Sequence, residues 1–264
     1  MSQGGSPTLG GGQWWTDRRY AAGYRLQTHA RSGQHRVLDE RDRQVCVGEL
    51  DACVEAMPAW EPPSELVVLL HGLGRRRQSL LPLSRALEAG GHHTLVLDYA
   101  STRAPIESHV ASLREVLANL PRAVETVCFV THSLGGIIAR HALSQGWHGP
   151  SPRLLAMLAP PSTSAMLATR LDSPPFRFVM GPSGAELAAG AEAPTPSIPF
   201  MIVAGGLRGG RGINPLLPGD DDGVVAFVET YLAGAAAHHR VNALHTTIMN
   251  HPEARAHVLA FLER

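Results

Sequence analysis

The stretch Thr131-His132-Ser133-Leu134-Gly135-Gly136 indicates the fold of this chain. An apolar run, residues 127–130, leads into it, and the helix-forming residues 137–143 follow. A strand, a sharp turn at a serine and a helix form a nucleophile elbow, which exposes the serine hydroxyl above a parallel sheet. Small residues are needed two positions before and after the serine, because the two chain segments nearly touch there. Gly135 meets this demand, whereas Thr131 stands where the usual pattern has glycine.

A simpler interpretation of the same residues is a buried strand followed by a helix that Ser133 caps. A second motif favours the elbow, because residues 65–70 form another apolar run that ends in His71-Gly72-Leu73-Gly74. Acyl transfer needs backbone N–H groups aimed at the oxyanion that forms on the attacked carbonyl. One comes from the residue after the nucleophile and one from the loop after an earlier strand. We therefore predict an oxyanion hole made by the backbone N–H groups of Leu134 and Leu73.

Downstream, the chain supplies an acid in Asp220-Asp221-Asp222-Gly223 and then a base in His245. The order serine, acid, histidine is that of α/β-hydrolases and differs from the orders of chymotrypsin-like and subtilisin-like proteases. We predict that Ser133 is the nucleophile, that His245 is the general base, and that an aspartate of this run orients the imidazole. His251 is the alternative base.

These motifs resemble those of the bacterial α/β-hydrolase esterases and lipases, from about Trp14 to the C-terminus. Residues 97–102 look like the strand and loop after the first crossover helix in lipase-like members. Residues 157–162 are similar to the segment after their nucleophile helix, and residues 245–264 resemble their ending. The resemblance selects Asp222 as the acid, because an acid followed by Gly-Val-Val matches the acid loop of that family; Asp220 is the alternative. The resemblance implies no metal, because the residues that build a calcium site in some secreted lipases have no counterpart after His245.

The same resemblance implies an α/β-hydrolase fold, a mostly parallel central sheet flanked by helices. Alternating strands and helices along the chain indicate such a sheet independently. The expected strands are residues 66–70, 94–98, 126–130, 154–158, 200–204 and 240–244, and a helical apolar period runs from Ile106 to Leu120.

The domain organisation that we expect has three parts. Residues 1–13 are glycine-rich and polar and should be a disordered tail. Residues 14–63 should form an N-terminal extension packed on the core, with a hairpin around the turn at 40–43 and a short helix after residue 49. Residues 64–264 should be the hydrolase domain. Within it, the proline- and serine-rich stretch 160–199 is either a lid-like segment whose apolar groups line an acyl pocket or a surface excursion packed on the sheet.

Composition excludes several classes of function. The chain has 264 residues and a net charge of zero, and all 23 of its basic residues are arginine. Without lysine, a Walker-type phosphate loop, a pyridoxal Schiff base and a Ser-Lys dyad are impossible. The neutral charge favours neither nucleic acid nor an anionic membrane as partner. We expect no cofactor and a small-molecule or lipid ester as substrate.

Three cysteines, Cys46, Cys53 and Cys128, are too few and odd in number for a disulfide scaffold. The N-terminal residues lack the pattern of a secretory signal, and no apolar run approaches the ~20 residues of a membrane span. These features predict a cytoplasmic protein.

Other polar residues have simpler interpretations. Asp98, at a strand end, is expected to be a structural hydrogen-bond partner, and His71 and His132 to be scaffolding. His238 and His239 are expected in the loop before the last strand, and His92 and His93 in a turn. The run Arg75-Arg76-Arg77 is either solvated or a rim that attracts anionic substrates.

Three functions are compatible with this sequence. The first is hydrolysis of carboxylic esters with short to medium acyl chains. The second uses the same three residues on thioesters or amides, or for acyl transfer to an acceptor other than water. The third is a non-catalytic binding module, which has little need of all three groups. Fold alone does not separate the first two.

Overall fold

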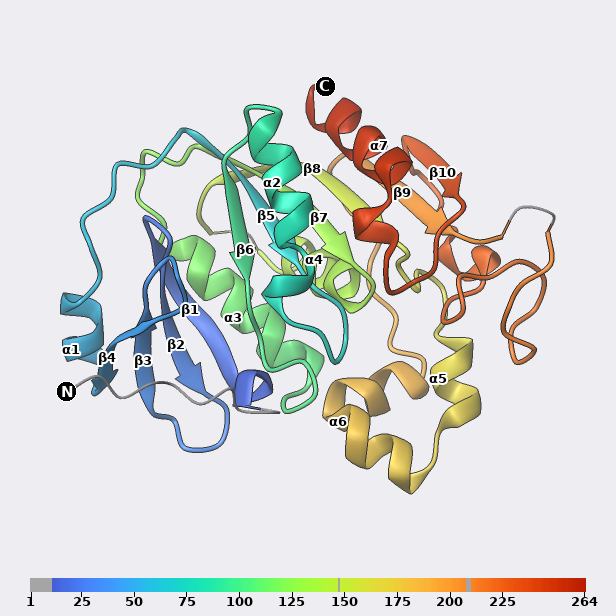
Figure 1. The fold of residues 1–264 in the computed structure, drawn as a ribbon, viewed down its shortest axis with the longest axis horizontal. Coiled ribbons are helices and arrows are strands. Elements are labelled where there is room, and N and C mark those ends of the chain that lie inside the picture. Colours follow the sequence, from blue (N-terminus) through green and yellow to red (C-terminus); the bar gives the residue numbers. More distant parts are fainter. Residues whose placement is uncertain (1–10, 147, 208–209) are drawn as a thin grey trace.

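The computed structural model describes residues 11–146, 148–207 and 210–264. Figure 1 shows a central sheet flanked by helices, with a smaller N-terminal sheet beside it. Most of the expected tail, residues 1–10, lies outside the described residues. Residues 11–13 differ from the expectation, since they belong to a short 3-10 helix, η1 (Gly11–Trp14). In the described part of the chain, no helix combines the length and apolar character needed to cross a membrane.

The central sheet is parallel throughout, with its six strands in the order β10-β9-β8-β7-β5-β6. These strands are β5 (Glu65–Leu70), β6 (Thr94–Leu97), β7 (Thr126–His132), β8 (Ser151–Leu158), β9 (Phe200–Gly205) and β10 (Ala237–Val241). Parallel strands end at the same edge of a sheet, so the loops after β5, β7 and β9 gather there.

The last strand begins three residues earlier than expected. β10 covers Ala237–Val241, so His238 and His239 lie inside the strand, and the prediction that they precede it is wrong. The physical reason is that β10 is the outermost strand of this sheet and pairs only with β9. Its side chains are mostly half-buried and therefore need no apolar run.

Helices cover both faces of the central sheet, because side chains along a strand alternate between the faces. Leu66, Val68 and Leu70 pack in one cluster with helices α3 (Ile106–Ala118) and α4 (Leu134–Ser144). On the other face, Val67 and Leu69 pack with α2 (Leu81–Ala89) and α7 (Pro252–Leu262). Short 3-10 helices η2 (Arg77–Ser79), η3 (Phe227–Thr230) and η4 (Ile248–Asn250) lie in the connecting loops.

The N-terminal extension is a four-stranded antiparallel sheet followed by a short helix. Its strands are β1 (Trp15–Ala21), β2 (Tyr24–His29), β3 (His35–Leu38) and β4 (Gln44–Gly48), and the helix is α1 (Leu50–Glu55). The expected hairpin is β3–β4, and the expected helix is α1. Figure 1 shows this sheet next to α3 and β6, at the end of the central sheet opposite β10.

Strands β1 and β2 carry no apolar alternation, which is why sequence analysis missed them. Their buried positions include Asp17, Arg25 and Gln27, each at most 2% exposed. Gln27 Nε2 donates to Asp17 Oδ1 at 2.8 Å, and the Arg25 guanidinium lies 3.4 Å from the same oxygen. These polar groups satisfy one another inside the extension, so a buried strand can form here without the usual pattern.

The stretch 160–199 contains two helices, α5 (Met166–Leu171) and α6 (Pro174–Ala188). α6 is kinked at Gly181, where φ is 67° and a Cβ atom would overlap the Thr102 carbonyl. Beyond the kink, Ser183 Oγ donates to the Ala104 carbonyl at 2.9 Å and fastens the helix to the core. Before the kink, Phe178 is 83% exposed. Figure 1 shows both helices projecting from the edge where the strands end.

Candidate active site

Ser133 occupies a strained turn between β7 and α4. Its backbone has φ 52° and ψ −120°, in a region that non-glycine residues rarely adopt. The Ser133 N–H donates to the Leu158 carbonyl at 2.9 Å, which ties the turn to the neighbouring strand β8. The Ser133 side chain makes no capping hydrogen bond with the helix. The interpretation of Ser133 as a helix cap is therefore wrong, and its hydroxyl remains available to the pocket above the sheet.

Close packing around the turn explains its neighbouring residues. A Cβ atom on Gly135 would lie 2.6 Å from the Leu70 carbonyl oxygen, so only glycine fits. Thr131, at the position where glycine is usual, is fully buried, and its hydroxyl donates to the Ala156 carbonyl at 3.4 Å. This hydrogen bond to the neighbouring strand β8 satisfies the buried hydroxyl of the threonine at that position.

Asp222 and His245 form a buried hydrogen-bonded pair. His245 Nδ1 lies 2.8 Å from Asp222 Oδ2, and the two residues are 7% and 3% exposed. The second carboxylate oxygen, Oδ1, accepts the backbone N–H groups of Val224 at 3.0 Å and Val225 at 2.8 Å. The His245 N–H donates to the Asp222 carbonyl at 2.9 Å. These contacts fix the carboxylate and the imidazole relative to each other.

The neighbouring aspartates have different partners. Asp220 accepts the Leu207 N–H at 2.9 Å and pairs with Arg240. Asp221 accepts the Gly223 N–H at 2.7 Å and closes the loop. The rival base, His251, stands before the first residue of α7, and the structure places it outside the pocket that Ser133 lines. Geometry therefore joins Asp222 with His245, the pair that the sequence predicts.

The loop after β5 passes directly against Ser133. A Cβ atom on Gly72 would lie 3.1 Å from the Ser133 Cβ, and the next residue, Leu73, lines the same pocket as Ser133. Leu134 is the first residue of α4, so its N–H has no acceptor within the helix. Both predicted oxyanion donors are thus on segments adjacent to the nucleophile, and the positive end of the α4 dipole lies at the same place.

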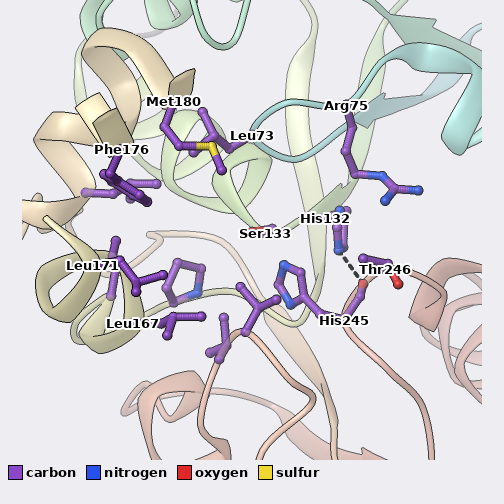
Figure 2. A pocket seen from close by; sticks show the side chains of 16 residues that line it. Leu73, Arg75, His132, Ser133, Leu167, Leu171, Phe176, Met180, His245 and Thr246 are labelled. Carbon is purple, nitrogen blue, oxygen red and sulfur yellow. Dashed lines mark hydrogen bonds between the residues drawn. The ribbon is translucent and has the colours of Figure 1, made fainter. Parts of the chain in front are cut away.

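The pocket has a volume of about 330 Å³ and contains both Ser133 and His245. Figure 2 shows Ser133 in the middle, with His245 below it and apolar side chains to one side. These apolar side chains come from the loop after β5 and from α5 and α6, and they include Leu73, Leu167, Leu171, Phe176 and Met180. The stretch 160–199 therefore forms a wall of the pocket.

His132 forms a hydrogen bond with the backbone of His245. Its Nε2 donates to the His245 carbonyl at 2.9 Å, and the two rings lie 4.8 Å apart. Burial, together with the charges of His245 and Arg75, lowers the pKa of His132 well below its ordinary value. His132 is therefore a neutral donor that holds the His245 backbone. The expectation of scaffolding did not identify this contact, because it joins residues 113 positions apart.

A second histidine–aspartate pair lies beside the loop after β5, which carries the predicted oxyanion donor Leu73 and is called the oxyanion loop below. His71 Nε2 is 3.2 Å from Asp98 Oδ1, and His71 Nδ1 is 2.9 Å from the Gly72 carbonyl oxygen. The His71 ring stacks on Tyr99 with centroids 4.0 Å apart. Burial raises the pKa of Asp98, but the hydrogen bond and charge of His71, together with the charges of Arg76 and Arg25, outweigh it, so the pKa lies below its ordinary value. Asp98 thus has the structural role that its position at a strand end predicts.

No cluster of three or more potential metal ligands occurs among the residues that the structure describes. The three cysteines carry free thiols: Cys128 lies buried in β7, and Cys46 and Cys53 lie in the extension with their sulfur atoms 3.5 Å apart.

The comparisons with known proteins agree with this architecture. The structure is similar to a lipase of Bacillus licheniformis in its mature form, with 17% identity, a TM-score of 0.59, and coverage of 77% of this chain and 92% of that one. It is also similar to polyneuridine aldehyde esterase, with 14% identity, a TM-score of 0.52, and coverage of 76% and 100%. At these identities the likeness concerns the fold alone. A search of curated proteins finds no matching sequence.

A sequence model of one family covers most of the chain. Its description is the alpha/beta hydrolase family, and it matches residues 67–261, from β5 to the end of α7. The matched segment includes Ser133, Asp222 and His245 and leaves the four-stranded extension outside. The chain belongs to the alpha/beta hydrolase family.

Proposed function

We propose that the protein is a serine hydrolase that cleaves carboxylic esters with short to medium acyl chains. The observation that carries this proposal is the strained turn at Ser133, which opens on the same pocket as a histidine already paired with a buried carboxylate. A strained serine without a capping role is costly to maintain, and such strain persists where it serves a function.

The proposed reaction begins with proton transfer. His245 Nε2 removes the proton of the Ser133 hydroxyl as its oxygen attacks the ester carbonyl carbon. The Asp222 carboxylate holds the imidazole in the tautomer with its proton on Nδ1 and stabilises the cation that forms, without taking the proton itself. His245 then gives the proton to the departing alkoxide, which leaves the acyl group on Ser133. A water molecule, activated by His245, releases the acid and restores the enzyme.

Charge develops on the carbonyl oxygen in each tetrahedral intermediate. The proposed donors to it are the N–H groups of Leu73 and Leu134, each worth about 3 kcal/mol in comparable sites. The loop that carries Leu73 is held at both ends. The Gly74 N–H donates to Ser101 Oγ at 3.0 Å, and the His71–Asp98 pair lies on the other side. A fixed loop costs no reorganisation when the charge appears.

The acyl chain is expected to lie among the apolar side chains beside Leu73. Each methylene that enters such a surface contributes up to about 0.8 kcal/mol, so activity across acyl lengths measures the depth of the pocket. A p-nitrophenyl ester series from acetate to palmitate should show its optimum at short to medium chains. An optimum at the longest chains with activation at an oil–water interface would instead indicate a lipase for long-chain fats.

Covalent labelling tests the nucleophile directly. A fluorophosphonate probe should modify Ser133 in folded protein, as located by peptide mass spectrometry, and should not modify the Ser133→Ala variant. Labelling of another serine would contradict the assignment. Faster cleavage of matched thioesters than of oxygen esters would favour the thioester function, and no turnover of either would favour a binding module.

A further inference from the structure

Three consecutive arginines follow the oxyanion loop, and the structure separates their roles. Arg76 Nε lies 3.7 Å from Asp98 Oδ2, and Arg77 Nη1 lies 3.1 Å from Asp42 Oδ1. Arg75 has no carboxylate within ion-pair distance in the described part of the chain, and its buried Nε has no hydrogen-bond partner there. Arg76 therefore ties the loop to the end of β6, and Arg77 ties it to the N-terminal extension. The charge of Arg75 is left without such a partner.

The side chain of Arg75 lines the pocket that contains Ser133 and His245. In Figure 2 it lies on the opposite side of Ser133 from Leu73, Phe176 and Met180. Its backbone is fixed, because the Arg75 N–H donates to the Gly72 carbonyl at 3.2 Å and Gln13 Nε2 donates to the Arg75 carbonyl at 2.8 Å. The pocket thus has an apolar side and a cationic side, with the reacting hydroxyl between them.

The charges around the pocket leave this cation uncompensated. Among the described residues that line the pocket there is no aspartate or glutamate. The carboxylate of the proposed catalytic pair, Asp222, already accepts hydrogen bonds from His245, Val224 and Val225. The Arg75 charge also bears on His132, since it is one of the causes that lower the pKa of His132. An anion beside Arg75 would offset this charge while His245 carries its proton.

The two halves of an ester extend in opposite directions from the carbonyl carbon, which lies over the nucleophile during attack. With the acyl half among the apolar side chains, the alcohol half points toward Arg75. A guanidinium binds carboxylates and phosphates through two parallel N–H donors. We propose that Arg75 binds an anionic group, a carboxylate or a phosphate, carried by the alcohol half of the substrate. This proposal rests on the proposed esterase function and specifies its substrate class.

Matched substrates test the proposal. Butyrate esters of 4-hydroxyphenylacetate and 4-hydroxyphenylacetamide differ in charge but have nearly the same shape and leaving oxygen. The butyrate ester of 4-hydroxybenzylphosphonate carries a phosphate-like group instead of the carboxylate. The anionic ester with the higher kcat/KM shows whether the site prefers a carboxylate or a phosphate. For each protein, the measured quantity is the ratio of kcat/KM for an anionic ester to that for the amide. A variant that is partly unfolded lowers both kcat/KM values by the same factor, so the ratio does not change.

We expect the Arg75→Gln variant to lower this ratio by about 10- to 100-fold for at least one of the anions, mainly through KM. Arg75→Lys should retain part of the preference for the anionic ester, because lysine keeps the positive charge but lacks the two parallel N–H donors of the guanidinium. Arg76→Gln removes the same charge one residue away and is the matched control, with a ratio expected to stay within about twofold of the wild type. An unchanged ratio in Arg75→Gln, or an equal fall in Arg76→Gln, would overturn the proposal.

A binding measurement separates this proposal from the proposed function. The ethers 4-butoxyphenylacetate and 4-butoxyphenylacetamide cannot be hydrolysed. Calorimetry therefore measures their Kd whether or not the protein cleaves esters. Tighter binding of the acid, lost in Arg75→Gln, would support the anion site even if no ester were cleaved. Equal binding of the two ethers would overturn the anion site, whereas turnover of the neutral amide ester that disappears in Ser133→Ala would still support the esterase.

Discussion

Two buried histidine–aspartate pairs lie at the carboxyl edge of the same sheet, yet they have different surroundings. In the Asp222–His245 pair, 2.8 Å apart, His245 Nδ1 contacts the carboxylate and the ring also lines the pocket. In the Asp98–His71 pair, 3.2 Å apart, both imidazole nitrogens are engaged by protein oxygens, and the ring is fully buried against Tyr99. One pair borders the pocket, and the other contacts only protein.

The comparison shows that residue types and their separation do not define a catalytic pair. What differs is the environment of the second imidazole nitrogen. A histidine can move protons to and from a substrate only if that nitrogen is accessible, whereas a histidine with two protein partners fixes the segments that carry those partners. Substitutions in the first pair should therefore change turnover, and substitutions in the second should change stability.

The largest effect is expected at the pair that faces the pocket. Asp222→Asn and His245→Ala should each lower kcat by about ten-thousand-fold, because in the proposed mechanism both residues act in the transition state. Steady-state kinetics with a short-chain ester measures kcat, and thermal unfolding should show that both variants still fold. Asp220→Asn is the matched control and should retain most of the activity. If Asp220→Asn abolished turnover and Asp222→Asn did not, the assignment of the acid would be wrong.

A smaller effect, on stability, is expected at the enclosed pair. Asp98→Asn removes a charge from a buried pair and leaves His71 with a poorer partner, which should lower the free energy of unfolding by about 3 kcal/mol. Urea unfolding followed by fluorescence measures this loss. In folded protein, kcat should fall by no more than about tenfold, because the pair supports the oxyanion loop from outside the pocket. A loss of kcat as large as that of His245→Ala with unchanged stability would erase the distinction between the two pairs.

The smallest effect is expected in acid, beside the enclosed pair. Burial, and to a lesser extent the charge of His71, lowers the pKa of His109 from 6.5 to about 4. His109 packs against Tyr99 with ring centroids 4.9 Å apart. The unfolded chain binds this proton more readily than the folded one, so the stability contribution is full above pH 6.5 and is lost as the pH falls toward 4. The loss between pH 7.5 and pH 5 should be about 2 kcal/mol.

The variant His109→Gln cannot titrate and tests this acid dependence. Urea midpoints of the two proteins across the pH range should show a shallower fall for the variant. Parallel curves for both proteins would mean that other groups cause the acid sensitivity.

The order of the chemical motifs in the sequence predicts much of the architecture. Apolar runs predict the parallel strands, because a strand buried on both faces needs apolar residues throughout. The same order selects His245 and an aspartate of the run 220–222, within which the family resemblance selects Asp222. The structure brings Asp222 and His245 within hydrogen-bonding distance, although their catalytic role stays a prediction. Strands β1 and β2 could not be predicted, since their buried residues are polar and are stabilised by partners elsewhere in the extension.

The separate roles of the three arginines were also hidden. Arg75, Arg76 and Arg77 are identical in type and adjacent, and only the positions of Asp42 and Asp98 in space distinguish them. Asp42 belongs to a turn in the extension, more than thirty residues away in the chain. The sequence therefore offers the run as a possible rim for anionic substrates, but which of the three arginines lacks a carboxylate partner is decided only when folding places Asp42 and Asp98.

The contact between β1 and the end of β6 has a consequence for protein production. β6 is the outer strand of the central sheet, and just beyond it Asp98 exchanges two hydrogen bonds with Asp17, at 2.9 and 2.6 Å, while the Ala100 N–H donates to Thr16 Oγ1 at 3.1 Å. A chain trimmed to the matched family segment would leave these backbone groups unpaired at an open sheet edge. Open edges pair with other molecules, so the trimmed protein should aggregate. We therefore expect the N-terminal sheet to protect this end of the central sheet from self-association.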